Sequence, residues 1–357
     1  MKVQRLGGAL IALALAMPAM APAADFQDVL DTSAMASPLA AKGLLNGLAL
    51  AGQRVVGVGQ RGHIVYSDDQ GKSWRQAKVP VASDLVAVSF PTSQQGWAVG
   101  HDGVVLHSGD AGATWTKQLE GRALGGVLVA HYQAQAAKAG GAAAETAAKW
   151  VSEAERFAAQ AAENPFLDVW FADDKTGFVV GAFNLILRTG DGGKTWQPWL
   201  DRTDNPQALH LYGIRAAGGE VFVTGEQGLV MRLDAAAGRF VAVPTPYKGS
   251  YFGVTGTRDA VIVYGLRGNA WRSTDRGASW HKLDTGVTEG LTAGAVVGER
   301  DVFLASQAGR LLVSHDGGEH FSPVKQERAL PAAAVQPLGA DAVVLAGARG
   351  VRVQPLQ

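Results

Sequence analysis

Residues 67–74 read SDDQGKSW, a short motif that we call an Asp box and that recurs four times along the chain. The other copies are SGDAGATW (108–115), TGDGGKTW (189–196), STDRGASW (273–280) and SHDGGEHF (314–321). Asp can accept hydrogen bonds from the backbone N–H groups of a turn, and Gly adopts a positive φ that other residues resist. Catalytic groups converge on one point, whereas these near-identical boxes are spread along the chain. We therefore interpret them as structural turns, formed around Asp69, Trp74, Asp110, Trp115, Asp191, Trp196, Asp275, Trp280, Asp316 and Phe321.

A second motif accounts for the spacing of the boxes. It consists of an apolar stretch, Gly-x-x-Gly and an alternating strand, as in VVGVGQRGHIVYS (55–67). It occurs seven times, and the fourth copy is followed by a degraded box and the seventh by none. The first position of the Gly-x-x-Gly pattern is occupied by Gly59, Gly100, Gly181, Gly225, Gly265, Ser306 and Gly347.

Each of these copies follows a further apolar stretch, so one unit contains four short strands in a period near 41 residues. Four strands in a unit of roughly 40–45 residues are typical of a propeller blade. The sequence therefore predicts an all-β, seven-bladed β-propeller over residues 24–357. The last unit supplies only three strands. We expect the N-terminal segment of the mature chain to add the missing strand to the last blade, because this would leave no sheet edge open.

The N-terminus has the features of a secretory signal peptide. MKVQR is basic, a short apolar run follows, and Ala21-Pro22-Ala23 forms a small-residue cleavage signal. An uncleaved anchor is the alternative, but the run is short for a membrane span of about 20 residues. We expect removal of residues 1–23 and a soluble, periplasmic protein without membrane insertion. The absence of Cys excludes disulfides and lipid attachment through an N-terminal Cys.

Composition and motifs exclude several classes of function. The formal net charge is zero, which gives no reason to expect the basic surface of a nucleic-acid-binding protein. The sequence contains no metal-binding spacing of His and Cys, no P-loop and no Gly-x-Ser-x-Gly elbow. We therefore predict a monomeric binding protein with no catalytic residues, metal or cofactor.

An Ala-rich insertion occupies residues 122–163, between blades 2 and 3. Its Ala, Glu, Gln and Lys residues favour helix, and Gly140-Gly141 divides it into two helical stretches. We expect a helical hairpin that either packs on the propeller or docks into a groove of a partner. At helical spacing, one face of the second helix carries Trp150, Ala154, Phe157, Ala158 and Ala161.

The Gly-x-x-Gly turns and the connections between blades should emerge on one face of the propeller, opposite the boxes. The insertion joins two blades and belongs to the same face, which is where we expect function. Arg suits recognition of a carboxylate or a peptide C-terminus through its planar fork, although charged loop tips are often simply solvated. The candidate partner-binding rim consists of Arg61, His101, Phe183, Gln227, Arg267 and Arg349.

The boxes resemble the bacterial neuraminidase repeat. With their upstream motifs, as in GQRGHIVYSDDQGKSW and GLRGNAWRSTDRGASW, they resemble the photosystem II stability/assembly factor-like family over nearly all of the mature chain. The resemblance implies a non-catalytic propeller scaffold that helps assemble photosystem II by binding an immature reaction-centre subunit. It also implies a basic rim patch, to which Arg61, Arg267 and Arg349 could correspond. The insertion and the neutral charge depart from the photosynthetic pattern, so we expect the partner to be a membrane protein complex of the bacterial envelope, or its immature subunit.

The alternative is a sialidase-like or other glycoside hydrolase of the same repeat class. A sialidase would need an Arg triad, a Tyr/Glu nucleophile pair and an Arg-Ile-Pro motif. This sequence has no Arg-Ile-Pro, and no Tyr lies at the tip of a Gly-x-x-Gly turn. Paired carboxylates for glycoside hydrolysis are not evident either, because Asp102 and Glu226 are isolated candidates. The scaffold is the interpretation we favour.

Overall fold

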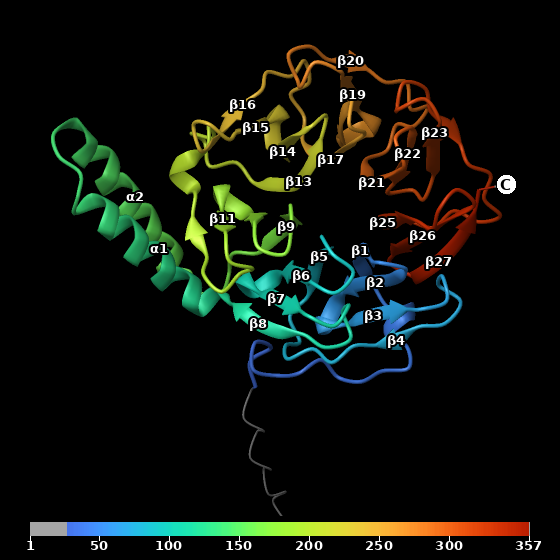
Figure 1. Ribbon diagram of the computed structural model, residues 1–357, viewed down its shortest axis with the longest axis horizontal. Helices are drawn as coiled ribbons and strands as arrows, with labels where there is room; N and C mark the ends of the chain where they lie inside the picture. Colours follow the sequence, from blue (N-terminus) through green and yellow to red (C-terminus); the bar gives the residue numbers. More distant parts are fainter. Residues whose placement is uncertain (1–26, 357) are drawn as a thin grey trace, which may run out of the picture.

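The computed structural model describes residues 27–356, so the predicted signal peptide lies outside the described residues. Seven antiparallel sheets form a ring (Figure 1), and sheet order follows chain order in every one. The first strands of neighbouring sheets contact one another, and the last contacts the first, so they line the centre of the ring. The prediction of a seven-bladed β-propeller is confirmed.

The strands follow the repeat, four to a blade except in the last. Blades 1 to 3 contain β1 (Leu45–Ala51), β2 (Arg54–Gly59), β3 (Ile64–Ser67), β4 (Arg75–Gln76), β5 (Leu85–Ser89), β6 (Gly96–Gly100), β7 (Val105–Ser108), β8 (Thr116–Leu119), β9 (Phe166–Phe171), β10 (Gly177–Gly181), β11 (Ile186–Thr189) and β12 (Gln197–Pro198). Blades 4 and 5 contain β13 (Leu211–Ala217), β14 (Glu220–Gly225), β15 (Val230–Asp234), β16 (Arg239–Ala242), β17 (Tyr251–Gly256), β18 (Val261–Gly265), β19 (Ala270–Ser273) and β20 (His281–Lys282). Blades 6 and 7 contain β21 (Leu291–Val297), β22 (Asp301–Ser306), β23 (Leu311–Ser314), β24 (Ser322–Pro323), β25 (Ala332–Pro337), β26 (Ala342–Gly347) and β27 (Gly350–Pro355).

Tight turns join the second and third strands of each blade at the Gly-x-x-Gly motifs. A Cβ on Gly59 would overlap the carbonyl oxygen of Leu44, which precedes blade 1, and one on Gly62 would overlap that of Val81, which leads to blade 2. Only glycine permits this approach, and Gly62 also has a φ of 70°. The turns and the inter-blade connections therefore share one face, as expected. Five of the turns are single 3-10 turns, η2 (Gln60–Gly62), η3 (His101–Gly103), η4 (Ala182–Asn184), η6 (Glu226–Gly228) and η7 (Leu266–Gly268).

Every first strand contains a bulge near its start. In β1, for example, Leu45 pairs with Gly59 and Gly47 with Val58, so Asn46 has no partner in the register. An extra residue of this kind bends the strand and re-aims its side chain. The seven unpaired residues are half-buried and form a ring at the centre of the Gly-turn face: Asn46, Val86, Leu167, Tyr212, Phe252, Thr292 and Ala333.

The N-terminal segment runs beside blades 1 and 2 and does not complete the last blade. Residues 27–44 form no strand and contain one 3-10 turn, η1 (Ala40–Lys42). The backbone N–H of Ala34 donates to the carbonyl of Val79 at 3.0 Å, and the side chain of Leu30 is buried in the core of these two blades. The expectation of an N-terminal closing strand is therefore wrong for the described residues, because burial of Leu30 and these bonds hold the segment elsewhere.

The ring closes by packing instead. Strand β25 of the last blade packs against β1 of the first, and η1 contacts β27, where the backbone of Ala41 and Lys42 lies against Gly350. Ala40 is buried between the two blades together with Leu45 and Ala346. Closure thus depends on apolar contacts between complete sheets.

The insertion folds as predicted into a hairpin of α1 (Gly121–Ala136) and α2 (Ala142–Ala159), which projects from the ring in Figure 1. Gly103 of η3 packs against the Cα of Gly121, which places the hairpin base on the Gly-turn face. Tyr132 is buried and donates its hydroxyl to Asp201 at 3.0 Å, in the turn η5 (Leu200–Arg202) of blade 3. No helix in residues 27–356 has the length and apolarity needed to cross a membrane.

The expected apolar face of the second helix is only partly buried. Ala154 and Phe157 lie in the core that α1 shares with blades 2 and 3, and Trp150 stacks on Tyr132 with ring centroids 5.7 Å apart. Ala158 and Ala161 are exposed. The buried residues of α2 lie in its C-terminal half, and most of residues 142–149 are exposed.

Candidate functional site

The carboxylates of the Asp boxes are occupied within their own turns. Oδ1 of Asp69 accepts hydrogen bonds from the Ser67 hydroxyl and the Ser73 backbone N–H, both at 2.8 Å, and Oδ2 accepts the Ser73 hydroxyl at 2.5 Å. These bonds, those from Ser73 most of all, lower the pKa of Asp69 to about 2. The same arrangement recurs at Asp110, Asp191 and Asp275, and with His320 at Asp316.

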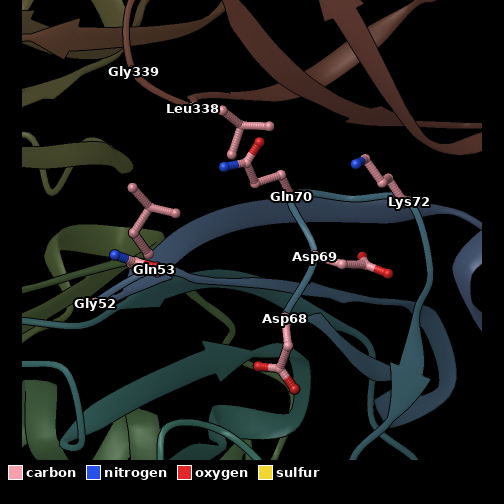
Figure 2. A pocket seen from close by; sticks show the side chains of 9 residues that line it. Gly52, Gln53, Asp68, Asp69, Gln70, Lys72, Leu338 and Gly339 are labelled. Carbon is pink, nitrogen blue, oxygen red and sulfur yellow. The ribbon is translucent and has the colours of Figure 1, made fainter.

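A pocket of about 520 Å³ opens on the box face where blade 1 meets blade 7 (Figure 2). Its two carboxylates are already engaged, since Asp69 belongs to a box and Asp68 accepts a hydrogen bond from Nε of Arg54 at 2.6 Å. A glycosidase needs a general acid whose pKa is raised, whereas the pKa of Asp69 is lowered. Asp69 therefore does not match the general acid of a glycosidase. The lining residues are Leu50, Gly52, Gln53, Asp68, Asp69, Gln70, Lys72, Leu338 and Gly339.

Potential metal ligands are dispersed. Within residues 27–356, no group of three or more His, Cys, Asp or Glu side chains lies close enough together to hold a metal ion.

The opposite face presents one turn residue from each blade. In five blades the middle residue of the turn has a left-handed backbone, which costs a non-glycine residue of the order of 1 kcal/mol or more. The five residues and their φ angles are Arg61 (55°), Asp102 (57°), Phe183 (53°), Gln227 (51°) and Arg267 (58°).

Most residues of the predicted rim occupy these tips. Arg61, Phe183, Gln227 and Arg267 are exposed there. His101 is exposed one position before the tip of its blade, which is Asp102. Arg349 is exposed in the two-residue turn between β26 and β27.

The three rim arginines do not form one cluster. Arg61 and Arg349 lie on blades 1 and 7, which pack against each other, and Lys42 of η1 lies between these blades against Gly350. We call Lys42, Arg61 and Arg349 the basic sector. Arg267 belongs to blade 5, so blade 6 with its uncharged turn residues 307–308 separates it from this sector.

Aromatic rings form a continuous row on the same face, and we call Phe183, His210, Tyr212 and Phe252 the aromatic row. Successive ring centroids lie 4.5, 6.3 and 5.9 Å apart, with edge-to-face geometry. Phe183 is 42% exposed and the other three are half-buried. The guanidinium of Arg156, on α2, lies 5.5 Å from the Phe183 ring centroid. The row thus extends from the helical hairpin to the bulge residues at the centre of the ring.

Hydrogen bonds hold the row in place. The backbone N–H of Phe183 donates to Nδ1 of His210 at 2.8 Å. The carboxylate of Glu226 accepts the backbone N–H of His210 at 2.9 Å and the hydroxyl of Tyr212 at 3.4 Å. Burial, and then the Glu226 charge, raise the pKa of Tyr212, which keeps its phenol protonated. The rings are therefore presented in defined orientations.

Of the aromatic row, the sequence prediction included only Phe183. His210 lies in the connection before blade 4, and Tyr212 and Phe252 are the second residues of first strands. Tyr212 in LYG and Phe252 in YFG occupy equivalent positions of the repeat. Both are aromatic where the other blades have Asn, Val, Leu, Thr or Ala, and this difference is the signal that could have identified them.

The two sectors suit different parts of one polypeptide ligand. Aromatic rings offer apolar area with a defined geometry and low entropic cost. The guanidinium groups of the basic sector suit a carboxylate. The two sectors together therefore offer an apolar contact surface and a carboxylate-binding surface on one face of the ring.

The chain resembles known proteins along its sequence. The family model described as "Photosynthesis system II assembly factor YCF48" matches residues 52–138 and 142–283. The Photosystem II assembly lipoprotein Ycf48 of Synechococcus sp. (strain CC9902) is 30% identical over 155 residues, which are 42% of this chain and 44% of the relative. That of Prochlorococcus marinus (strain NATL2A) is 65% identical over 34 residues, 10% of each chain. The matched region spans less than half the length of these curated relatives.

Solved structures share the fold over most of the chain. "YCF48 bound to D1 peptide" has a TM-score of 0.64 at 16% identity and covers 89% of this chain and 94% of its own. "YCF48 from Cyanidioschyzon merolae" has a TM-score of 0.62 at 15% identity, covering 89% and 97%. A GH74 enzyme of Niastella koreensis has a TM-score of 0.61 at 12% identity and covers 88% of this chain and 52% of the enzyme, a likeness of fold alone. Since the family model matches well over half of its length, the chain belongs to the photosynthesis system II assembly factor YCF48 family.

Proposed function

We propose that this protein is a non-catalytic periplasmic scaffold that binds an extended peptide segment of an immature subunit and so helps assemble or stabilise a membrane protein complex of the envelope. The chain belongs to a family of assembly factors, and one solved neighbour is described as YCF48 bound to D1 peptide. The observation that carries the proposal is that the basic sector of blades 7 and 1 and the aromatic row of blades 3 to 5 lie on one face of the ring.

In this proposal, an apolar or aromatic side chain of the peptide packs on Phe183 and Tyr212, and a carboxylate binds Arg61 and Arg349. Glu226 is engaged by His210 and Tyr212, so it orients the row. The periplasmic location rests on the signal-peptide pattern at residues 1–23.

The test is a binding titration of the mature chain with the D1 peptide, followed by fluorescence anisotropy. We expect Arg61→Ala/Arg349→Ala to weaken binding by at least tenfold, because hydrogen bonds to charged groups contribute about 1.5–3 kcal/mol. Phe183→Ala should weaken it by roughly tenfold, as expected for an aromatic anchor. Arg267→Ala should have a smaller effect, because blade 6 separates Arg267 from the basic sector.

The matched control is Arg276→Ala. Arg276 is also an exposed arginine at a left-handed turn position, with a φ of 58°, but it lies in an Asp box on the opposite face. Its variant should bind as wild type does. Equal affinity of wild type, Arg61→Ala/Arg349→Ala and Phe183→Ala would contradict the assignment of this face. Failure of the mature chain to bind the peptide and to retain any subunit of a membrane complex from envelope membranes would contradict the function.

A further inference from the structure

The outer edge of blade 7 differs from that of the other blades. In blades 1 to 6 the third strand pairs with a fourth strand, which is only two residues long in β4, β12, β20 and β24. In the described part of the chain, the sheet of blade 7 ends at β27, whose six residues all pair with β26. Such an edge offers a template for another extended chain.

The register shows which backbone groups face outward. Gly347 pairs with Gly350 across a two-residue turn, so these two residues form a hydrogen-bonded pair. Hydrogen-bonded and non-hydrogen-bonded pairs alternate along an antiparallel ladder, so every second pair after this one is also hydrogen-bonded. Arg352 and Gln354 therefore bond to β26. The N–H and C=O groups of Val351 and Val353 point away from β26, and within residues 27–356 they have no backbone partner.

The N-terminal segment, the expected source of a closing strand, is held on another part of the ring. Nζ of Lys117 donates to the carbonyl of Leu30 at 2.8 Å, and Arg122 forms an ion pair with Asp31 at 2.7 Å. Both contacts lie at the end of blade 2 and the base of the hairpin. Residues 27–39 therefore leave the edge of β27 uncovered.

The charges beside this edge are mostly basic. Nη1 of Arg352 donates to the carbonyl of Arg328 at 2.6 Å, whereas its Nε and Nη2 are buried without a hydrogen-bond partner in the described residues. Arg328, Arg349 and Lys42 are exposed around the strand. Lys325 adds a fifth basic residue, and Glu327 is the acidic residue of the segment 325–328. The exposed basic side chains beside the edge favour an occupant that carries carboxylates.

We propose that β27 accepts an extended, acidic segment of a partner polypeptide, which pairs antiparallel with Val351 and Val353 and completes blade 7 as its fourth strand. The outward N–H and C=O groups select an extended backbone over a helix or a lipid, because only an extended chain matches their spacing. The basic residues select carboxylate side chains. This site is on the outer rim of the ring. It shares Lys42 and Arg349 with the basic sector, but it uses neither Arg61 nor the aromatic row.

The experiment uses the mature chain and a ten-residue peptide of alternating valine and glutamate residues. Amide hydrogen exchange should show at least tenfold greater protection of Val351 and Val353 at saturating peptide. A peptide N-methylated at alternate residues should not bind, because it lacks the N–H groups of one edge. A valine–lysine peptide should bind at least tenfold more weakly, because its charge is reversed.

Val353→Pro removes one outward N–H and leaves the bonds between β26 and β27 intact, since Pro is tolerated at a strand edge. We expect roughly tenfold weaker peptide binding, because the variant loses the hydrogen bond from this N–H and distorts the adjacent hydrogen bonds to the peptide. An unchanged thermal midpoint of the Val353→Pro variant, together with unchanged hydrogen-exchange protection of the Gln354 amide, would establish that the blade remains folded. Arg328→Glu should weaken binding, whereas Lys282→Glu, which reverses an exposed charge on the complete blade 5, should not.

Three results would overturn the inference. One is equal binding of the N-methylated peptide, and another is unchanged binding by a folded Val353→Pro variant. The third is strong protection of Val351 and Val353 in the free protein, which would mean that this polypeptide or a second copy already covers the edge. Sedimentation would distinguish these two occupants.

Discussion

The two faces of the propeller use the same blades in different ways. On the box face, five turns repeat nearly the same side chains, and those side chains bond to their own turn, as Asp69 does to Ser67 and Ser73. On the Gly-turn face, the backbone repeats but the exposed side chain changes from Arg61 to Phe183 to Gln227. Repetition of side chains indicates a structural role, because every blade needs the same turn. Variation on a constant backbone is what a binding surface for an asymmetric ligand requires.

The largest expected effect tests how strictly the Gly-turn backbone is constrained. Gly100→Ala should destabilise the protein by about 3 kcal/mol or more, because the new Cβ would overlap the carbonyl oxygen of Asp84 and force the backbone to shift. Gly109→Ala on the box face is the matched control. Its Cβ would lie 3.8 Å from the nearest neighbouring atoms, on Gln95, so the change should be within about 0.5 kcal/mol. Chemical denaturation measures the unfolding free energy of each variant. Similar values for the two variants would contradict the requirement for glycine in the Gly turns.

A smaller effect tests the structural role of the boxes. Asp110→Ala removes the acceptor for the Thr114 backbone N–H at 2.9 Å and for the hydroxyls of Ser108 and Thr114. We expect a loss of about 1–2 kcal/mol, as for other Asp side chains that cap backbone N–H groups. Asp102→Ala, at a turn tip on the other face, should change stability by about 0.5 kcal/mol or less. If the two variants were equally stable, the two faces would not differ as we describe.

The smallest effect concerns the box of blade 6, where His320 replaces the usual Ser or Thr. Nδ1 of His320 lies 2.8 Å from the Asp316 carboxylate, and this contact raises the pKa of His320 above its usual value. Because the folded-state pKa is raised, the stabilisation is fully present below the unfolded pKa and is lost as pH rises through the folded pKa. The thermal midpoint of His320→Ser should therefore rise relative to wild type between about pH 5.5 and pH 8.5. A midpoint difference that is constant with pH would contradict this role.

Part of the site could be predicted because tip residues follow directly from the motif. Gly59 and Gly62 identify the turn, so Arg61 between them is at the tip. The same reasoning placed His101 in the rim, although the left-handed position of that turn belongs to Asp102. The position within a turn depends on backbone dihedrals, and the Gly spacing does not distinguish the two residues.

Other parts depend on which blades become neighbours. His210, Tyr212 and Phe252 come from two blades and form a row with Phe183 only because a bulge re-aims the second residue of each first strand. The N-terminal segment is another case. The three-stranded last unit predicted that this segment would pair with the last blade, but the burial of Leu30 and the ion pair between Asp31 and Arg122 hold it beside blades 1 and 2.

The seven-fold repeat, the box turns, the helical hairpin and the face of the Gly turns were all predictable from the amino-acid sequence. These features follow from local chemistry, because turn residues, strand alternation and helix propensity act over a few neighbouring positions. The aromatic row and the open edge of β27 became evident only in the folded ring. They depend on contacts between blades, and such contacts exist only once the ring has closed.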